Sequence, residues 1–416
     1  MKVVRLSEAL NKLKESWKPR LKVERLPLRE ALGRVLAVDV ESPIDLPPFN
    51  RSAVDGYAVK AQDTYGADEE NPARLKLAFK VPIGTMPTGE VREGECAYVT
   101  TGSALPRGAD AVVMVEYTHQ KDEMVEVYRA VVPGENVVLK GSEAKKGAKL
   151  LRKGSKLSPS KLGLLAAIGL SQVEVYAKPK VAVISTGPEL VEPGKPLEEG
   201  KAYDVNTTTI SAMVEEEGGE AEVMGLVPDN LDELRAKLSE ALNKADLVLT
   251  SGGTSKGESD LLPKAVAELP GSNIIAHGLA LKPGKPTLIA LVGDKPVIGL
   301  PGNPTSAMLV FKVLVRPLIR TILGLAAEER AEKVRAKASV RMTSVKGRRE
   351  FKFGLLEKHN GELYFKPLTT GSEAVATYAL ADGYVEIPEE VELLDEGEEV
   401  EVELLKGSVS LDNNVS

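Results

Sequence analysis

Two glycine-containing turns in the middle of the chain have the residue types that bind phosphate. Residues 185–190 (Ser-Thr-Gly-Pro-Glu-Leu) and 250–260 (Thr-Ser-Gly-Gly-Thr-Ser-Lys-Gly-Glu-Ser-Asp) each follow an apolar run. Glycine lets a ligand approach the backbone, whose N–H groups cradle phosphate. Neither turn has P-loop or GxGxxG spacing. The alternatives are an ordinary strand-to-loop turn for the first and a flexible loop for the second. The candidate binding residues are Thr186, Gly187, Ser251, Gly252 and Gly253.

Two further turns combine prolines and glycine with cations or a helix start. In residues 281–286 (Leu-Lys-Pro-Gly-Lys-Pro), rigid framing lowers the entropy cost of presenting Lys282 and Lys285 to one anion. A solvated charge pair is the alternative, and spacing alone favours it. Residues 300–306 link an apolar run to a helix whose N-terminus can face an anion, and a plain helix start is the alternative. The candidates there are Pro301, Gly302 and Asn303.

Carboxylates and an arginine complete this set of polar residues. Glu189, Asp229 and Asp260 have the chemistry to hold Mg²⁺, which usually keeps several waters and bridges phosphates. Arg348, in a tight turn over residues 347–351, suits bidentate contact with an oxyanion, although a surface turn is the alternative. His277 stands beside these motifs, where a structural role is favoured over that of a catalytic base. The residues therefore predict a site for an anionic, phosphate-bearing ligand.

The elements that would position this site alternate between strand and helix over residues 178–324. Apolar runs at 180–184, 221–227, 246–250 and 296–300 predict strands. Helical patterns follow at 207–217 with Asn206 as cap, at 231–245, from about 259, and at 304–323 with Asn303 as cap. Such alternation is typical of an α/β domain with a mostly parallel sheet, which binds ligands at the carboxyl ends of its strands.

The remaining segments read as β-structure with a few helices. Short strands are expected at 57–59, 75–81, 97–101, 111–115 and 124–127, and again at 338–342, 351–355, 362–366 and 399–404. Helices are expected at 7–17, at about 27–33 and at 158–168, the last between the cap Ser158 and Gly169.

Composition narrows the class of protein. The formal net charge of −7 disfavours a nucleic-acid binder, which would show a basic face. There is no apolar stretch of signal-peptide length and no run of about 18 apolar residues, so we expect a cytoplasmic protein without a membrane segment. The single cysteine, Cys96, excludes an internal disulfide and is expected to be buried. One cysteine and three histidines do not build a zinc site of the usual spacing.

Seven motifs stand in a fixed order along the chain. They are residues 48–58 (Pro-Phe-Asn-Arg-Ser-Ala-Val-Asp-Gly-Tyr-Ala), 101–103 with 105–113, 185–190, 251–260, 282–286, 301–306 and 347–351. Together they resemble the molybdopterin molybdenumtransferases, a family related to the C-terminal domain of gephyrin. The run Ser-Ala-Val-Asp-Gly-Tyr-Ala is very specific, and the resemblance extends to about residue 390.

The resemblance implies a multidomain fold. A central three-layer α/β domain with a mostly parallel sheet (178–326) would bind molybdopterin. A discontinuous helical segment (1–46 and 141–177) would carry an inserted small β-domain (47–140). A C-terminal β-barrel-like domain (327–408) and a tail (409–416) would follow. It also implies a homodimer with a shared active site, which Arg348 and Ser372 would reach from the other subunit.

The implied reaction inserts molybdate or tungstate into adenylylated molybdopterin, with Mg²⁺-dependent release of AMP. Glu189 and Asp260 would hold the metal ion or place the attacking oxygen, and Lys282, Lys285 and Arg348 would hold the oxyanion. Asp55 would complete the cleft, with Thr101, Asp229 and Ser372 among the binding residues. Outside this resemblance, Asp55 reads as a turn former before Gly56.

Two positions depart from the family pattern, and two rival functions stay open. Pro188 and Glu143 occupy positions where aspartate is common in the family, and Pro188 casts doubt on the role of its neighbour Glu189. A molybdopterin adenylyltransferase, which is also a possible partner, would release pyrophosphate from ATP instead of AMP. A non-catalytic scaffold would bind a partner tightly without turnover.

Overall fold

The computed structural model describes residues 3–253, 261–327, 331–369, 371 and 373–405. The chain forms two compact units. One consists of Arg25–Val175, and the other combines Met1–Glu24 with Tyr176–Ser416. The chain passes between them along β1 (Val23–Pro27) and β12 (Gln172–Tyr176), which pair with each other. Within the described residues, no helix combines the length and the apolar character needed to cross a membrane.

A six-stranded sheet forms the centre of the second unit. Four strands lie side by side in parallel, and two further strands extend the sheet through antiparallel pairings. All five residues of the third strand are buried, as expected for a strand with helices on both faces. The strand order is β16 (Glu220–Val227), β13 (Lys180–Thr186), β17 (Leu247–Ser251), β21 (Lys295–Leu300), β20 (Leu288–Val292) and β18 (Ser272–His277).

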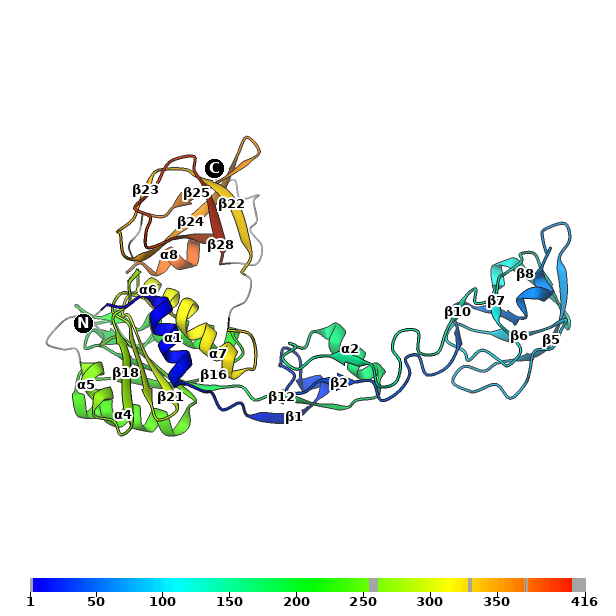
Figure 1. Cartoon of the computed structure of the whole chain (residues 1–416), viewed down its shortest axis with the longest axis horizontal. Coiled ribbons are helices and arrows are strands. Elements are labelled where there is room, and N and C mark those ends of the chain that lie inside the picture. Colours follow the sequence, from blue (N-terminus) through cyan, green and yellow to red (C-terminus); the bar gives the residue numbers. More distant parts are fainter. Residues whose placement is uncertain (1–2, 254–260, 328–330, 370, 372, 406–416) are drawn as a thin grey trace. The chain divides into compact units, whose positions relative to one another are not determined.

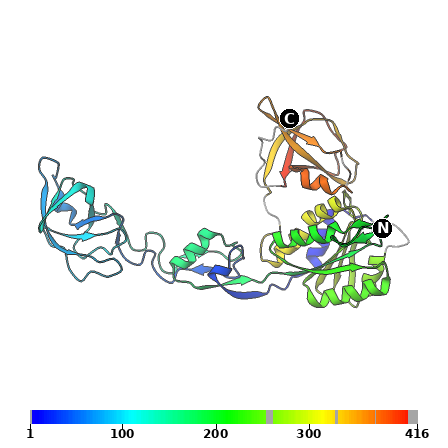
Figure 2. The same cartoon turned by 180° about the vertical axis from the view of Figure 1, so that it is seen from behind.

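Helices cover both faces of this sheet (Figures 1 and 2). On one face, α4 (Leu231–Lys244) and α5 (Leu261–Ala267) pack their apolar residues against buried residues of β13, β17, β20 and β21. The helices of the opposite layer are α3 (Val205–Glu216), α6 (Pro304–Val310), α7 (Arg316–Ile322) and α1 (Leu6–Ser16). The α/β domain therefore has the three layers that the family resemblance implies.

The helix expected over residues 304–323 is interrupted. A π-helical segment, η4 (Phe311–Val315), separates α6 from α7. Pro317 follows it and lacks a backbone N–H, so the regular ladder cannot run through this position unbroken.

The C-terminal strands close into a barrel. β24 (Arg349–His359) pairs with β25 (Glu362–Pro367) and β26 (Gly383–Ile387), and β22 (Lys333–Ala338) with β28 (Glu399–Leu404) completes the ring. The prediction of a strand at 338–342 is wrong, because β22 pairs with β28 only up to Lys337 and with β25 only up to Ala338. The remaining elements are β23 (Met342–Thr343), α8 (Val375–Leu380) and β27 (Leu393–Leu394).

The first unit has separate apolar cores. One lies in a six-stranded β-domain, where Cys96 is buried as expected. Another joins residues from about 31–46 with residues from about 144–175. The helix expected near 27–33 is only a 3-10 turn, η1 (Leu28–Glu30). The β-domain strands are β7 (Ala111–Met114), β4 (Gly56–Val59), β6 (Glu95–Val99), β5 (Ala73–Lys80), β9 (Met124–Val127) and β8 (Thr118–Lys121).

Smaller elements complete the first unit and the surface of the second. Ser158 caps α2 (Pro159–Ala167) by accepting a hydrogen bond from the Lys161 N–H, as the sequence predicts. The short strands and 3-10 turns are β2 (Val40–Glu41), β3 (Arg51–Ser52), β10 (Val137–Val138), β11 (Lys149–Leu151), β14 (Leu190–Val191), β15 (Ala202–Tyr203), η2 (Ala61–Thr64) and η3 (Val115–Tyr117).

Candidate functional site

The carboxyl ends of three parallel strands bring the predicted turns together. Ser185 at the end of β13 lies opposite Ser251 at the end of β17, and Ser251 lies opposite Leu300 at the end of β21. The turns that follow these strands therefore start from one row across the sheet. This is the edge at which parallel α/β sheets bind ligands.

Gly252 makes the close approach of two turns possible. Its φ of +88° lies in the left-handed region, and a Cβ there would collide with the carbonyl oxygen of Thr186. A Cβ on Gly302 would lie 3.9 Å from the Cα of Gly252, so the turns after β17 and β21 are neighbours. Pro301 is buried, whereas Gly302 and Asn303 are exposed at the start of α6. Gly253 follows in the same turn and also has a positive φ.

Asn206 ties these turns together, a role that the sequence did not indicate. Its side-chain N–H₂ group donates to the Ser251 hydroxyl and to the carbonyl oxygen of Gly302, both at 2.7 Å. The residue is only 6% exposed. Asn206 was expected to cap the following helix, but this is wrong. Asp204 caps α3 by accepting from the backbone N–H of Thr207, which leaves Asn206 inside the first turn of the helix.

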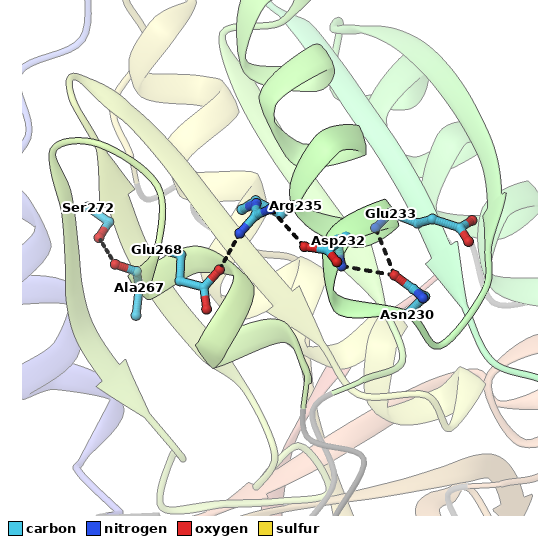
Figure 3. Close-up of polar contacts among 7 residues, drawn as sticks. All are labelled: Asn230, Asp232, Glu233, Arg235, Ala267, Glu268 and Ser272. Carbon is cyan, nitrogen blue, oxygen red and sulfur yellow. Dashed lines mark hydrogen bonds and ion pairs between the residues drawn. The ribbon is translucent and has the colours of Figure 1, made fainter.

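Asp229 is held at the same edge by two interactions. The Thr186 hydroxyl donates to the Asp229 carboxylate at 2.8 Å. The next residue, Asn230, caps α4 by accepting from the backbone N–H groups of Asp232 and Glu233 at 2.9 and 3.1 Å (Figure 3). A capped helix start fixes the loop before it, so the Asp229 carboxylate is presented from a rigid position.

The other two acidic candidates are Glu189 and Asp260, and the structure describes only Glu189. Glu189 is exposed, and its carboxylate lies over Gly187, 2.8 Å from the place that a Cβ on that glycine would take. Asp260 lies outside the described residues, as does the rest of 254–260. Within the described residues no three acidic, histidine or cysteine side chains gather as a metal cluster. Mg²⁺ bound through one or two carboxylates and substrate phosphates needs no such cluster, and Glu189 and Asp229 each offer carboxylate oxygens of the kind that this ion prefers.

Lys282 lies where the α/β domain meets the barrel. Its strand, β19 (Leu281–Lys282), pairs in parallel with the start of β24. The resemblance implied that Arg348 reaches the site from another subunit. The pairing sets Leu281 opposite Arg349 of the same chain, so the turn at Arg348 adjoins the Lys282 strand. A contribution of Arg348 to the site of another subunit stays a prediction. Ser372 lies outside the described residues.

Lys285 and His277 are placed mainly by their backbones. The carbonyl of Lys285 accepts from the N–H groups of Leu279 and Thr287, and its side chain is half-buried. His277 ends β18 opposite Leu288 in β20. These positions fit a rigid loop for Lys285 and a structural role for His277.

A buried carboxylate, which the sequence analysis missed, holds Lys282. Glu350 in β24 is 2% exposed and accepts from Lys282 Nζ at 3.1 Å and from Lys352 Nζ at 2.6 Å, both through Oε1. Burial raises the pKa of Glu350, but the two lysines outweigh it and leave the pKa below its ordinary value. These residues line a pocket of about 530 Å³ that Thr305, at the start of α6, also borders.

In the other unit, Asp55 forms a defined pair with Thr101. The Thr101 backbone N–H and hydroxyl donate to the same carboxylate oxygen at 2.6 and 2.8 Å. These two hydrogen bonds hold the pKa of the Asp55 carboxyl below its ordinary value. Both residues are exposed, so the ionised carboxylate faces solvent. Gly56 is required for packing, because a Cβ there would collide with the Val113 carbonyl oxygen.

Comparison with known families matches three regions of the chain. Residues 4–169 match the MoeA N-terminal region (domain I and II). Residues 182–321 match a probable molybdopterin binding domain, and residues 335–405 match the MoeA C-terminal region (domain IV).

Individual relatives match over nearly the whole chain. A molybdopterin molybdenumtransferase of Haemophilus influenzae is 34% identical over 96% of this chain and 98% of its own length. Molybdopterin molybdenumtransferase 2 of Mycobacterium tuberculosis is 34% identical over 91% and 94%. A solved structure of a molybdopterin biosynthesis MoeA protein from Pyrococcus horikoshii is 43% identical, with a TM-score of 0.84 over 98% of this chain and all of that one.

Proposed function

Since the chain belongs to the MoeA family of molybdopterin molybdenumtransferases, transferases of molybdenum cofactor biosynthesis, we propose that it joins the metal of molybdate or tungstate to adenylylated molybdopterin and releases AMP. The bond between the AMP phosphorus and the bridging oxygen would break as a water oxygen attacks that phosphorus, so AMP would leave and the bridging oxygen would stay on the molybdopterin phosphate. The dithiolene sulfurs of the pterin would then replace oxo ligands of the metal, which would leave as water with the thiol protons.

The observation that carries this proposal is the bracing of the glycine turns by Asn206. The two hydrogen bonds that the Asn206 side chain donates, both 2.7 Å long, fix the turns after β17 and β21 relative to each other before any ligand arrives. Preorganised backbone N–H groups stabilise a phosphate without reorganising during the reaction. Gly252, Gly253 and Gly302 would cradle the phosphates, with Thr186 and Ser251 as hydroxyl donors.

Carboxylates beside this cradle suit a Mg²⁺ ion. Glu189 and Asp260 would hold it, and Asp229 lies at the same edge through its bond to Thr186. When bound, Mg²⁺ neutralises charge on the phosphate oxygens. The chain itself would contribute a fixed geometry, because Thr186 and the capped start of α4 hold the Asp229 carboxylate in place.

Three basic side chains suit the oxyanion. Lys282, Lys285 and Arg348 would attract a tetrahedral dianion electrostatically. Thr305 belongs to the helix that starts from the Gly302 turn and lines the same pocket as Lys282. The phosphate and oxyanion positions would therefore be neighbours, as displacement of AMP by metal insertion requires.

The family resemblance assigns three more residues to the active site: Asp55, Thr101 and Ser372. It also supports a cytoplasmic homodimer whose two subunits share each active site. A molybdopterin adenylyltransferase would be its partner. Mixing Asp55→Asn protein with Lys282→Ala protein tests the shared site. If the mixture of the two inactive variants regains activity, one active site takes residues from two chains. If each subunit has an independent site, the mixture stays inactive.

Release of AMP from adenylylated molybdopterin tests the reaction itself. Wild type would be compared with Asp260→Ala and Lys282→Ala, with Mg²⁺ and with or without molybdate or tungstate. We expect oxyanion-dependent AMP release that both variants lose. No release with either oxyanion, from folded protein and intact substrate, would contradict the proposed function.

A further inference from the structure

Strand β24 brings a second ammonium group to Lys282. Lys282 Nζ and Lys352 Nζ lie 3.1 and 2.6 Å from the same oxygen, Oε1 of Glu350. Two cations bound to one atom are held close together. Residues 350 and 352 are two positions apart on one strand, so their side chains point to the same face of the barrel wall.

Burial makes Glu350 a firm anchor for both lysines. The side chain of Glu350 is only 3% exposed, and its second oxygen, Oε2, has no hydrogen-bond partner within the described residues. A buried carboxylate is costly unless cations pair with it. The two lysines supply that pairing, and both contact the same carboxylate oxygen.

The pocket around these groups has an excess of positive charge. Lys282, Lys352 and Arg341 line it together with Glu350. Arg341 pairs with the exposed carboxylate of Asp395 at 2.9 Å, which offsets its charge. The two lysines still outnumber Glu350, and each ammonium group has three N–H donors, of which Glu350 needs one.

Both lysines remain accessible to a ligand. Their side chains are 45% and 27% exposed, whereas the carboxylate beneath them is enclosed. An arriving anion would therefore meet two ammonium groups first. The hydroxyl-bearing residues Thr305 and Thr377 line the same pocket of about 530 Å³.

We propose that Lys352 is a second oxyanion-binding residue beside Lys282, and that Glu350 is a positioning residue that sets the spacing of the two ammonium groups. The ligand is the tetrahedral oxyanion of the proposed reaction, so this inference rests on the proposed function. It adds Lys352 to the proposed cations Lys282, Lys285 and Arg348, of which only Lys282 lines this pocket.

The test measures binding of tungstate alone by calorimetry and, separately, the oxyanion concentration that gives half-maximal AMP release. Lys352→Met removes one charged donor and should weaken tungstate binding and raise the half-saturating concentration roughly tenfold or more. The maximal rate at saturating oxyanion should change much less, and Lys352→Arg should keep most of the affinity. Unchanged tungstate binding and half-saturation in Lys352→Met would overturn the proposal.

Glu350→Gln separates positioning from simple charge. Removing the carboxylate makes the pocket more positive, so electrostatics alone predicts tighter tungstate binding. A positioning role predicts weaker binding, by several-fold, because the two ammonium groups lose their common anchor. Tighter binding in this variant would refute the role of Glu350.

Matched controls come from a Lys–Glu pair elsewhere on the barrel. Lys366 contacts Glu357 of β24 at 2.9 Å, and neither residue lines the pocket. Lys366→Met and Glu357→Gln should leave tungstate binding unchanged, and circular dichroism checks that every variant folds. If wild type releases AMP and Lys352→Met needs the same oxyanion concentration for half-maximal release, only this inference is refuted. Without wild-type AMP release the proposed function fails, and tungstate binding still decides the role of Lys352.

Discussion

Asn206→Ala removes the brace between two turns of the candidate site. It deletes two hydrogen bonds of 2.7 Å, which leaves the buried Ser251 hydroxyl and the carbonyl of the exposed Gly302 without that donor. A net hydrogen bond contributes about 1 kcal/mol, and a buried group left unsatisfied costs roughly 1–3 kcal/mol. We therefore expect the free energy of unfolding to fall by about 2–4 kcal/mol.

The same change should slow the reaction more than it weakens the fold. The turns after β17 and β21 would no longer be fixed relative to each other, and a small misplacement of positioning groups can cost about 100-fold in rate. Urea denaturation and oxyanion-dependent AMP release would be measured on the same protein, under conditions where it remains folded.

Ser272→Ala is the matched control for this variant. The Ser272 hydroxyl donates to the Ala267 carbonyl at 3.2 Å (Figure 3), and Ser272 lies opposite Val292, at the end of the sheet away from the site. Its loss should leave AMP release near the wild-type level. If Asn206→Ala releases AMP as fast as wild type, the brace has no functional role and the reasoning is refuted.

Three further predictions follow from single positions. Gly252→Ala places a side chain on a left-handed backbone, against the Thr186 carbonyl. Urea denaturation should therefore show that the free energy of unfolding falls by about 2 kcal/mol or more, and an unchanged free energy would contradict this packing. The depressed pKa of Asp55 means that its pairing with Thr101 stabilises the fold above the ordinary pKa of 3.8 and is lost as pH falls through the lower folded value. An NMR titration of Asp55 should therefore have its midpoint below 3.8 and move upward in Thr101→Val. Burial raises the pKa of the Cys96 thiol to about 12, so native protein at pH 8 should resist alkylation until it is denatured, and rapid native labelling would count against this core.

Local patterns identified most elements because their causes are local. The capping serine at 158, the glycine after α2 and the apolar runs that became β13 and β17 each act within a few residues. The carboxyl-edge rule for parallel sheets predicts that the turns of residues 185–190 and 250–253 follow strand ends at one edge of the sheet, and the register shows that β13 and β17 are neighbours there.

Long-range pairings account for what the sequence did not reveal. Asn206 contacts Ser251, 45 positions away, and Gly302, 96 positions away. In the sequence alone, an asparagine just before a helical pattern looks like an ordinary helix cap. Glu350 and Lys352 resemble alternating surface residues of a strand until β19 pairs with β24 and encloses the carboxylate. No local spacing links Lys282 to Glu350.

The most direct test of the central claim counts AMP and metal in one reaction. Wild-type protein, adenylylated molybdopterin, Mg²⁺ and tungstate would be incubated for a single turnover, and both AMP and pterin-bound tungsten would be quantified. The account predicts one tungsten bound to pterin for each AMP released, and neither product without oxyanion. AMP release that proceeds equally without oxyanion, or with no tungsten on the pterin, would contradict it.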